Sequence, residues 1–169
     1  FILFFILFIF INLLQGIIVV SLVSIIMPYY KKRHFLKDSI NSILRQTHQN
    51  FEILLIDDEA SEESRNYLKE IRNYDARIYL IKNEYNMGAG ESRNKGISIS
   101  KGKFIAFLDA DDYWDKNKLK LQIKFMKDNN YLVSHTSYQI INNKNQKNSI
   151  RLARNFYKVE DLLYSCDIG

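Results

Sequence analysis

The sequence predicts an α/β fold, with a mainly parallel sheet flanked by helices. Short apolar runs alternate along the chain with segments of helical periodicity, which is the pattern of repeated strand–helix–strand units. The length of 169 residues and the hydrophobic content of 47% suit one domain with a sizeable core. Only 1 Pro, 6 Gly and 1 Cys are present, which excludes collagen-like, Pro/Gly-rich disordered, disulfide-stapled and multi-cysteine zinc proteins.

Four apolar runs are expected to form the parallel sheet. They are apolar at nearly every position rather than at alternate ones, which is typical of strands covered on both faces. Polar or turn residues close them, among them Pro28 after the first run and Asp109 after the last. The four runs span residues 23–27, 51–56, 77–81 and 104–108. A further strand is expected over residues 131–141, before a polar turn at 142–148.

Four segments carry the signals of helices. In the first, apolar residues recur at helical spacing from Phe35 to Leu44. Ser61 is a favoured N-cap for the second, and the acidic residues that follow it complement the helix dipole. Gly88 opens the third, and Asp115 is expected to cap the fourth. The expected helices span residues 35–46, 61–72, 88–101 and 115–126.

The first twenty residues form a separate apolar segment. Seventeen of them are apolar and none is charged, so a helix over residues 1–20 would be about 30 Å long, enough to cross a bilayer. The segment lacks the basic start and the small-residue cleavage site of a signal peptide, and it runs without a linker into the first predicted strand. Three interpretations are kept: a membrane anchor, an artefactual extension, or a buried helix.

Positive charge is concentrated in the second part of the chain. Although the net charge is only +5, residues 116–158 carry ten Lys or Arg side chains and a single acid, Asp128. Few aromatic residues outside the apolar pattern are interleaved with these charges, so no nucleic-acid partner is expected. The segment is interpreted either as a solvated basic face or as a surface that attracts anionic lipid or a phosphate-bearing acceptor.

Acidic residues follow two of the predicted strands. Asp57 and Asp58 close the second run, and Asp109, Asp111 and Asp112 follow the fourth. In parallel sheets, ligands bind outside the carboxyl ends of the strands, where the strand order reverses. Clustered carboxylates repel one another, and Mg²⁺ or Mn²⁺ removes that repulsion while taking substrate phosphate oxygens as further ligands. We expect such a metal at Asp109 and Asp111; the alternative is an acidic loop that leads into a helix.

Five sequence blocks resemble those of glycosyltransferase family 2. Each block alone is a weak signal, but their combination and spacing over about residues 22–141 are specific. The blocks are VSIIMPYY at 23–30, SINSILRQT at 39–47, FEILLIDD at 51–58, NMGAGESRNKG at 86–96 and GKFIAFLDADD at 102–112. The resemblance implies a GT-A fold, binding of a nucleotide-diphosphate sugar, and transfer of the sugar with inversion.

For the nucleoside, the resemblance implies a pocket at the ends of the first and third blocks. Pro28 and Tyr30 would line this pocket, and Asp58 would accept the ring N–H of the base with Asp57 in support. The alternative for Tyr30 is packing in the core. Uridine diphosphate is the carrier that the resemblance favours, although thymine would present the same ring N–H.

For the diphosphate, the resemblance implies three further contacts. Arg93 would lie toward the pyrophosphate, since a guanidinium pairs bidentately with phosphate. Asp109 would contact the ribose or the metal, and Asp111 would be the main ligand of Mn²⁺ or Mg²⁺, which stabilises the departing diphosphate. The alternative for Arg93 is an exposed salt bridge on its helix.

The sequence departs from the family's blocks in two loops. Lys31 stands where Asn is usual, and the pair Glu59 and Ala60 stands where Gly-Ser is usual. The shape of these two loops is therefore expected to differ from that of the family.

The resemblance also implies the setting of the reaction. The acceptor would be a glycan or a lipid-linked sugar in surface polysaccharide biosynthesis. The protein would be cytoplasmic, peripheral to the membrane or anchored at its cytoplasmic face; the anchor would be the apolar segment 1–20, and the basic segment makes an anionic membrane surface a further expected partner.

The catalytic base is not assigned. In the family, this acid lies in a second half that would follow residue 169, so residues 22–169 are expected to be an incomplete donor-binding domain without activity of its own. The alternative function is binding of a nucleotide sugar without turnover.

Overall fold

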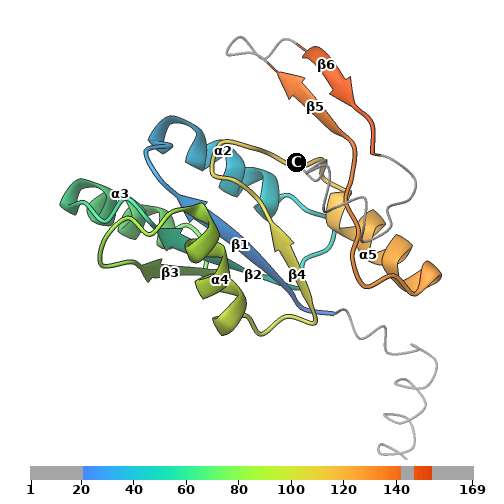
Figure 1. Cartoon of the computed structure of the whole chain (residues 1–169), viewed down its shortest axis with the longest axis horizontal. Helices are drawn as coiled ribbons and strands as arrows, with labels where there is room; N and C mark the ends of the chain where they lie inside the picture. Colours follow the sequence, from blue (N-terminus) through green and yellow to red (C-terminus); the bar gives the residue numbers. More distant parts are fainter. Residues whose placement is uncertain (1–20, 142–146, 154–169) are drawn as a thin grey trace, which may run out of the picture. The chain divides into compact units, whose positions relative to one another are not determined.

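The structure, a computed structural model, describes residues 21–141 and 147–153. The chain divides into two compact units, residues 1–118 and 119–169, which are considered separately. In the first unit, four parallel strands form one sheet in the order β3-β2-β1-β4 (Figure 1). They are β1 (Val23–Tyr29), β2 (Phe51–Asp57), β3 (Ile78–Lys82) and β4 (Phe104–Phe107). The predicted parallel sheet is thereby confirmed.

Three helices of the first unit connect these strands. They are α2 (Arg33–Leu44), α3 (Glu62–Arg72) and α4 (Ala89–Ile99). Ser61 caps α3 as predicted, and its hydroxyl accepts the N–H of Ser64 at 3.0 Å. The chain passes outward from β1 to β3 and then returns to β4 on the other side of β1. Right-handed crossovers therefore place α2 and α3 on one face of the sheet and α4 on the other.

The core lies on both faces of the two central strands. All seven residues of β2 are buried, and only Pro28 of β1 is partly exposed. Gly96 allows α4 to approach β1 closely, because a Cβ at this position would lie 2.5 Å from Cγ2 of Ile26. The helices contribute Leu36, Ile40 and Ile43 from α2 and Leu68 and Ile71 from α3. This packing fixes the strand ends.

Several helix boundaries differ from the prediction: the first helix, expected at 35–46, is Arg33–Leu44, and the third and fourth helices also differ. The third helix ends at Ile99, because the next residue, Ser100, is extended with φ −66° and ψ 141°. The fourth, α5 (Lys118–Asn129), begins after the expected cap. The carboxylate of Asp115 accepts the N–H of Asn117 at 2.8 Å, so it closes a turn that precedes the helix.

The second unit contains α5 and an antiparallel hairpin. The hairpin pairs β5 (Tyr138–Ile141) with β6 (Lys147–Arg151). The strand predicted over residues 131–141 is therefore wrong for its first seven positions. The ring of Tyr131 lies 5.5 Å from that of Phe125 on α5, so the chain here packs against the end of its own helix. The predicted polar turn at 142–148 is wrong where β6 begins, and residues 142–146 lie outside the described part.

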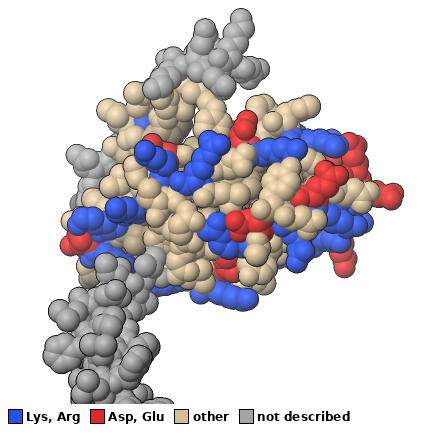
Figure 2. All heavy atoms as spheres, turned by 180° about the vertical axis from the view of Figure 1, so that it is seen from behind, with Lys and Arg blue, Asp and Glu red and all other residues tan. Residues whose placement is uncertain are grey.

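Within residues 21–141 and 147–153, no helix is both long and apolar enough to cross a membrane. The apolar segment 1–20, with its three interpretations, lies outside the described residues, as does the end of the predicted domain at 154–169. On the face drawn in Figure 2, Lys and Arg atoms are interspersed with Asp and Glu atoms.

Candidate functional site

The carboxyl ends of β1, β2 and β4 lie at one edge of the sheet. Because β1 lies between β2 and β4, the strand order reverses there, which is where parallel sheets bind ligands. Main-chain pairing continues past the strands: the N–H of Asp58 donates to the carbonyl of Tyr29 at 2.9 Å, and that of Leu108 donates to Ile26 at 3.2 Å. The residues just beyond these bonds therefore start from fixed positions.

Asp57 shapes the turn after β2. Its buried carboxylate accepts the hydroxyl of Ser64 at 3.0 Å and the N–H of Ala60 at 3.2 Å. Ala60 has φ 58°, a conformation that favours glycine, so this hydrogen bond holds a strained residue in place. Asp57 thus ties the turn to the first residues of α3, and Asp58 is positioned by that turn.

The two departures from the expected blocks contact each other. The N–H of Lys31 donates to Oε2 of Glu59 at 3.1 Å, and Lys31 itself has φ 53°. A glycine at position 59 would have no side chain to accept this bond. The loops after β1 and β2 are therefore joined in a way that is specific to this sequence.

Asp58 is buried, and both of its carboxylate oxygens accept hydrogen bonds from the chain. Oδ1 accepts Nδ2 of Asn83 at 2.9 Å and the N–H of Met87 at 2.8 Å. Oδ2 accepts the N–H of Gly88 at 3.0 Å, at a residue whose φ of 86° suits glycine. A carboxylate has about four acceptor positions, and residues in the described part of the chain occupy three of those on Asp58.

Asn83 was not predicted to have a role, yet it links three elements. Its buried amide donates to Asp58 and, at 2.9 Å, to the hydroxyl of Ser92 on α4. Its carbonyl oxygen accepts Nζ of Lys95 at 2.9 Å. The position of Asn83 directly after β3 is the signal that could have identified it.

The two predicted metal carboxylates are each paired with a cation. Nη2 of Arg93 lies 2.6 Å from Oδ1 of Asp109, and Nζ of Lys32 lies 2.6 Å from Oδ2 of Asp111. The hydrogen bond to Asp111 raises the pKa of Lys32 above its ordinary value. Desolvation raises the pKa of Asp112, and the carboxylates of Asp111 and Asp109 raise it further. The acidic cluster after β4 is thus stabilised by ion pairs with two cationic side chains, Lys32 and Arg93.

The partners of the two cations could not be read from the sequence. Arg93 forms a salt bridge, but with Asp109 on the loop after β4 rather than with a neighbour on its own helix. Lys32 was not predicted at all, and its place directly after Lys31 at the same strand end was the available signal. Ala110 is buried, while Asp109 is exposed and Asp111 is partly exposed, so the two carboxylates share one side of the loop.

A divalent cation at this edge would take only part of its coordination shell from the protein. In the described part of the chain, no three His, Cys, Asp or Glu side chains are arranged to hold a metal ion. Mg²⁺ and Mn²⁺ are, however, often bound by one or two carboxylates while substrate phosphate oxygens and water complete the shell. Asp109 and Asp111 fit such a metal once their pairs with Arg93 and Lys32 have opened.

Tyr30 and Pro28 lie at the end of β1. Tyr30 is 45% exposed, so the alternative that it packs in the core is wrong. Nζ of Lys31 lies 5.1 Å from the centroid of its ring. Pro28 is partly exposed and lies opposite Ile56 in the parallel register. An exposed aromatic face beside a rigid proline is a surface on which a base could stack.

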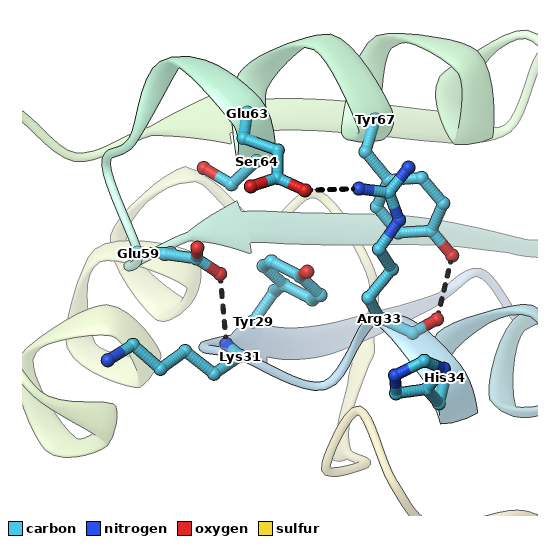
Figure 3. A pocket seen from close by; sticks show the side chains of 8 residues that line it. All are labelled: Tyr29, Lys31, Arg33, His34, Glu59, Glu63, Ser64 and Tyr67. Atoms are coloured by element: carbon cyan, nitrogen blue, oxygen red, sulfur yellow. Dashed lines mark hydrogen bonds and ion pairs between the residues drawn. The ribbon is translucent and has the colours of Figure 1, made fainter.

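A pocket of about 140 Å³ lies beside this edge, near the start of α2 and of α3 (Figure 3). It is lined by Tyr29, Lys31, Arg33, His34, Glu59, Glu63, Ser64 and Tyr67. One ion pair lies within it: Arg33 contacts Glu63 at 2.6 Å, and its guanidinium lies 4.6 Å from the ring of Tyr67. Burial, with Glu59 nearby, raises the pKa of Tyr29 to about 12. None of the predicted site residues lines this pocket, so it is distinct from the expected nucleoside site.

The chain matches the model of Glycosyl transferase family 2 over residues 24–167. The UDP-Glc:alpha-D-GlcNAc-diphosphoundecaprenol beta-1,3-glucosyltransferase WfgD of Escherichia coli is 43% identical over 148 residues, which are 88% of this chain and 57% of the relative. The putative teichuronic acid biosynthesis glycosyltransferase TuaG of Bacillus subtilis is 37% identical over 120 residues, which are 71% of this chain and 48% of the relative. The chain therefore spans about half the length of these relatives.

Solved structures resemble about two thirds of the chain. A solved chain of S. aureus TarS, residues 1–349 in complex with UDP, superposes with a TM-score of 0.56 at 28% identity, over 63% of this chain and 32% of that chain. The mannosyltransferase PcManGT of Pyrobaculum calidifontis, in complex with GDP-Man and Mn²⁺, gives a TM-score of 0.57 at 16% identity, over 62% of this chain and 32% of that protein. The second likeness concerns the fold alone. Together with the parallel sheet, these neighbours confirm the predicted GT-A fold.

Proposed function

Because the chain belongs to glycosyltransferase family 2, we propose that its acidic sheet edge binds the diphosphate of a nucleotide sugar in an enzyme that transfers the sugar to an acceptor. The observation that carries this proposal is the set of two ion pairs at the reversal of strand order. Arg93 holds Asp109 and Lys32 holds Asp111. With a donor and a metal bound, the two cations would pair with phosphate oxygens and the two carboxylates would be free to hold the metal.

The metal would be held by Asp111 and Asp109. Mn²⁺ or Mg²⁺ bound there neutralises charge on the departing diphosphate. Arg93 supplies a planar guanidinium that binds two phosphate oxygens at once, and Lys32 supplies a compact charge from the start of α2. These residues come from three separate parts of the sheet edge, which is why the site needs the folded domain.

The nucleoside would lie against Pro28 and Tyr30, with its base toward Asp58. A buried carboxylate with an acceptor position for the ligand selects a base that carries a ring N–H, as uracil does. Support for uridine diphosphate comes from WfgD, whose name gives UDP-Glc as donor, and from TarS, which was solved with UDP. Asp57 takes part by holding the turn that carries Asp58.

The acceptor would be a glycan or a lipid-linked sugar. WfgD acts on a sugar linked to diphosphoundecaprenol, and TuaG is named for teichuronic acid biosynthesis. Surface polysaccharide synthesis at the cytoplasmic face of the membrane is therefore the setting we propose, with the basic residues after 116 available to an anionic surface.

The transfer is proposed to invert the anomeric centre. An inverting displacement needs a general base opposite the leaving diphosphate. Within residues 21–141 and 147–153 we assign no side chain to that role. The second candidate function is accordingly binding of the nucleotide sugar without turnover.

Calorimetric titration of the chain with UDP, UDP-glucose and ATP tests the proposal. We expect UDP and UDP-glucose to bind and ATP to bind more weakly, because adenine lacks the ring N–H that Asp58 would accept. Equal affinity for UDP and ATP, or no binding of either, would contradict the proposed site. Release of glucose from UDP-glucose in a parallel incubation would favour turnover over binding alone.

A further inference from the structure

Helix α2 and the residues just after it present a row of polar groups to the segment that follows the acidic edge. The row consists of Ser39, Ser42 and Gln46, followed by the main chain of Thr47. Each member bonds to main-chain atoms between residues 110 and 116. The segment 110–116, which is distant from α2 in the sequence, therefore packs along this helix.

Ser39 makes the bond nearest to the predicted metal carboxylates. It is fully buried, and its hydroxyl donates to the carbonyl of Ala110 at 3.0 Å. A serine inside a helix ordinarily donates to the carbonyl four residues earlier, but that oxygen, on Phe35, is farther away at 3.3 Å. Ala110 lies between Asp109 and Asp111, so this hydroxyl holds the peptide that joins the two carboxylates.

Ser42 and Gln46 hold the rest of the segment. The hydroxyl of Ser42 accepts the N–H of Trp114 at 3.1 Å. The amide nitrogen of Gln46 donates to the carbonyl of Asp115 at 2.7 Å and to that of Ser42 at 3.1 Å, and the side chain is buried. The N–H of Thr47 donates to Lys116 at 2.8 Å.

The segment needs this support because the sheet gives it little. β4 has only four residues and, among the described strands, lies at one side of the sheet and pairs with β1 alone. Beyond it, the last ladder bond is that of Leu108 with Ile26. After that point, the main chain of the segment bonds to side chains of α2 and to Gln46 rather than to a neighbouring strand.

We propose that Ser39 is a positioning residue for the donor site, and that Ser42 and Gln46 extend its action along α2. The inference rests on the proposed function, since it assigns these residues to the metal and diphosphate rather than to the fold alone. When residues that hydrogen-bond to metal ligands and orient them are removed, metal affinity typically falls by about 10-fold to 100-fold.

The test compares Ser39→Ala with Ser24→Ala. Both serines are fully buried, and both substitutions remove a bonded hydroxyl. The hydroxyl of Ser24 accepts the N–H of Gly102 at 2.8 Å and donates to Glu52 at 2.5 Å, at the opposite edge of the sheet. For each protein, the dissociation constant of UDP is measured without and with Mn²⁺, together with the melting temperature.

We expect the gain from Mn²⁺ to fall by about 10-fold in Ser39→Ala, while the constant without Mn²⁺ stays that of the wild type. In Ser24→Ala, the melting temperature falls but the gain is unchanged. Ser39→Ala with a lower melting temperature and a full Mn²⁺ gain would overturn the proposal. So would an equal loss of gain in both variants.

Hydrogen exchange keeps this test separate from the proposed function. Amides of residues 108–115 are expected to lose protection in Ser39→Ala and in Gln46→Met, and to keep it in Ser24→Ala. If wild-type protein binds UDP with no gain from Mn²⁺, the proposed metal site is wrong, and unchanged metal-free UDP affinity in Ser39→Ala would then overturn the positioning role as well. Unchanged protection in Ser39→Ala would overturn it by itself.

Discussion

Replacement of Asp58 by asparagine tests whether its carboxylate organises the sheet edge. In Asp58→Asn, the amide oxygen can keep the bonds from Asn83 and Met87, but the amide nitrogen then faces the N–H of Gly88, which now lies 3.0 Å from Oδ2. One hydrogen bond to a charged group, about 1.5–3 kcal/mol, is lost, and two donors are left facing each other. We expect the free energy of unfolding to fall by about 2–4 kcal/mol.

Urea unfolding followed by circular dichroism measures this loss. With a slope of about 2 kcal/mol per M, the midpoint is expected to fall by about 1–2 M. Glu84→Gln is the matched control, because it makes the same change on an exposed residue of the neighbouring loop and should leave the midpoint unchanged. A wild-type midpoint in Asp58→Asn would refute the reasoning, and an equal fall in both variants would trace the effect to net charge.

Binding of UDP separates the two tasks of Asp58. Asp58→Ala is expected to weaken UDP binding by about 1.5–3 kcal/mol if the carboxylate meets the ring N–H. Asn83→Ala disturbs the same turn and leaves the carboxylate in place, so it should weaken binding less. Equal losses in the two variants would mean that Asp58 acts only through the turn.

Three further outcomes are expected. The hydrogen bond from Arg77 lowers the pKa of Asp75 to about 2, so the stabilisation by this ion pair is present above pH 4 and is lost as the pH falls through 2. Asp75→Asn should therefore lower the free energy of unfolding by about 1–2 kcal/mol at pH 7, and this difference from the wild type should shrink in urea titrations toward pH 2. A difference that stays constant with pH would argue against the ion pair. Gly96→Ala should cost about 1–3 kcal/mol of stability because its Cβ would collide with β1, and an unchanged melting curve would contradict this packing. Lys32→Ala should tighten Mn²⁺ binding in the absence of nucleotide, measured by electron paramagnetic resonance, because it frees the carboxylate of Asp111; weaker binding would show that the lysine does not compete with the metal.

The sheet and its first three helices could be predicted because their signals are local. The second apolar run appears as a strand buried along its whole length, and Ser61 caps its helix as the side-chain chemistry requires. The segment 131–137 could not be judged in this way, since its apolar residues form a strand only where another strand offers free N–H and C=O groups. Its aromatic residue instead packs on α5.

The candidate site was predicted in its acids but not in their partners. The position of Asp58, Asp109 and Asp111 after apolar runs could be read directly from the sequence. The ion pair of Lys32 with Asp111 depends on β4 lying beside β1, and strand order is not a local property. The hydrogen bond of Ser39 with Ala110 also depends on the tertiary fold, so in the sequence Ser39 could be recognised only as part of a helical segment.

The most direct test of the account is the effect of Mn²⁺ on UDP binding by the wild-type chain and by Asp111→Asn. We expect Mn²⁺ to strengthen UDP binding to the wild type and Asp111→Asn to abolish this gain. The affinity of the variant for UDP without metal should equal that of the wild type, because the proposed nucleoside contacts follow other strands. UDP binding that is the same with and without Mn²⁺ in the wild type, or a full gain in Asp111→Asn, would contradict the assignment of the acidic sheet edge as the site of the donor diphosphate.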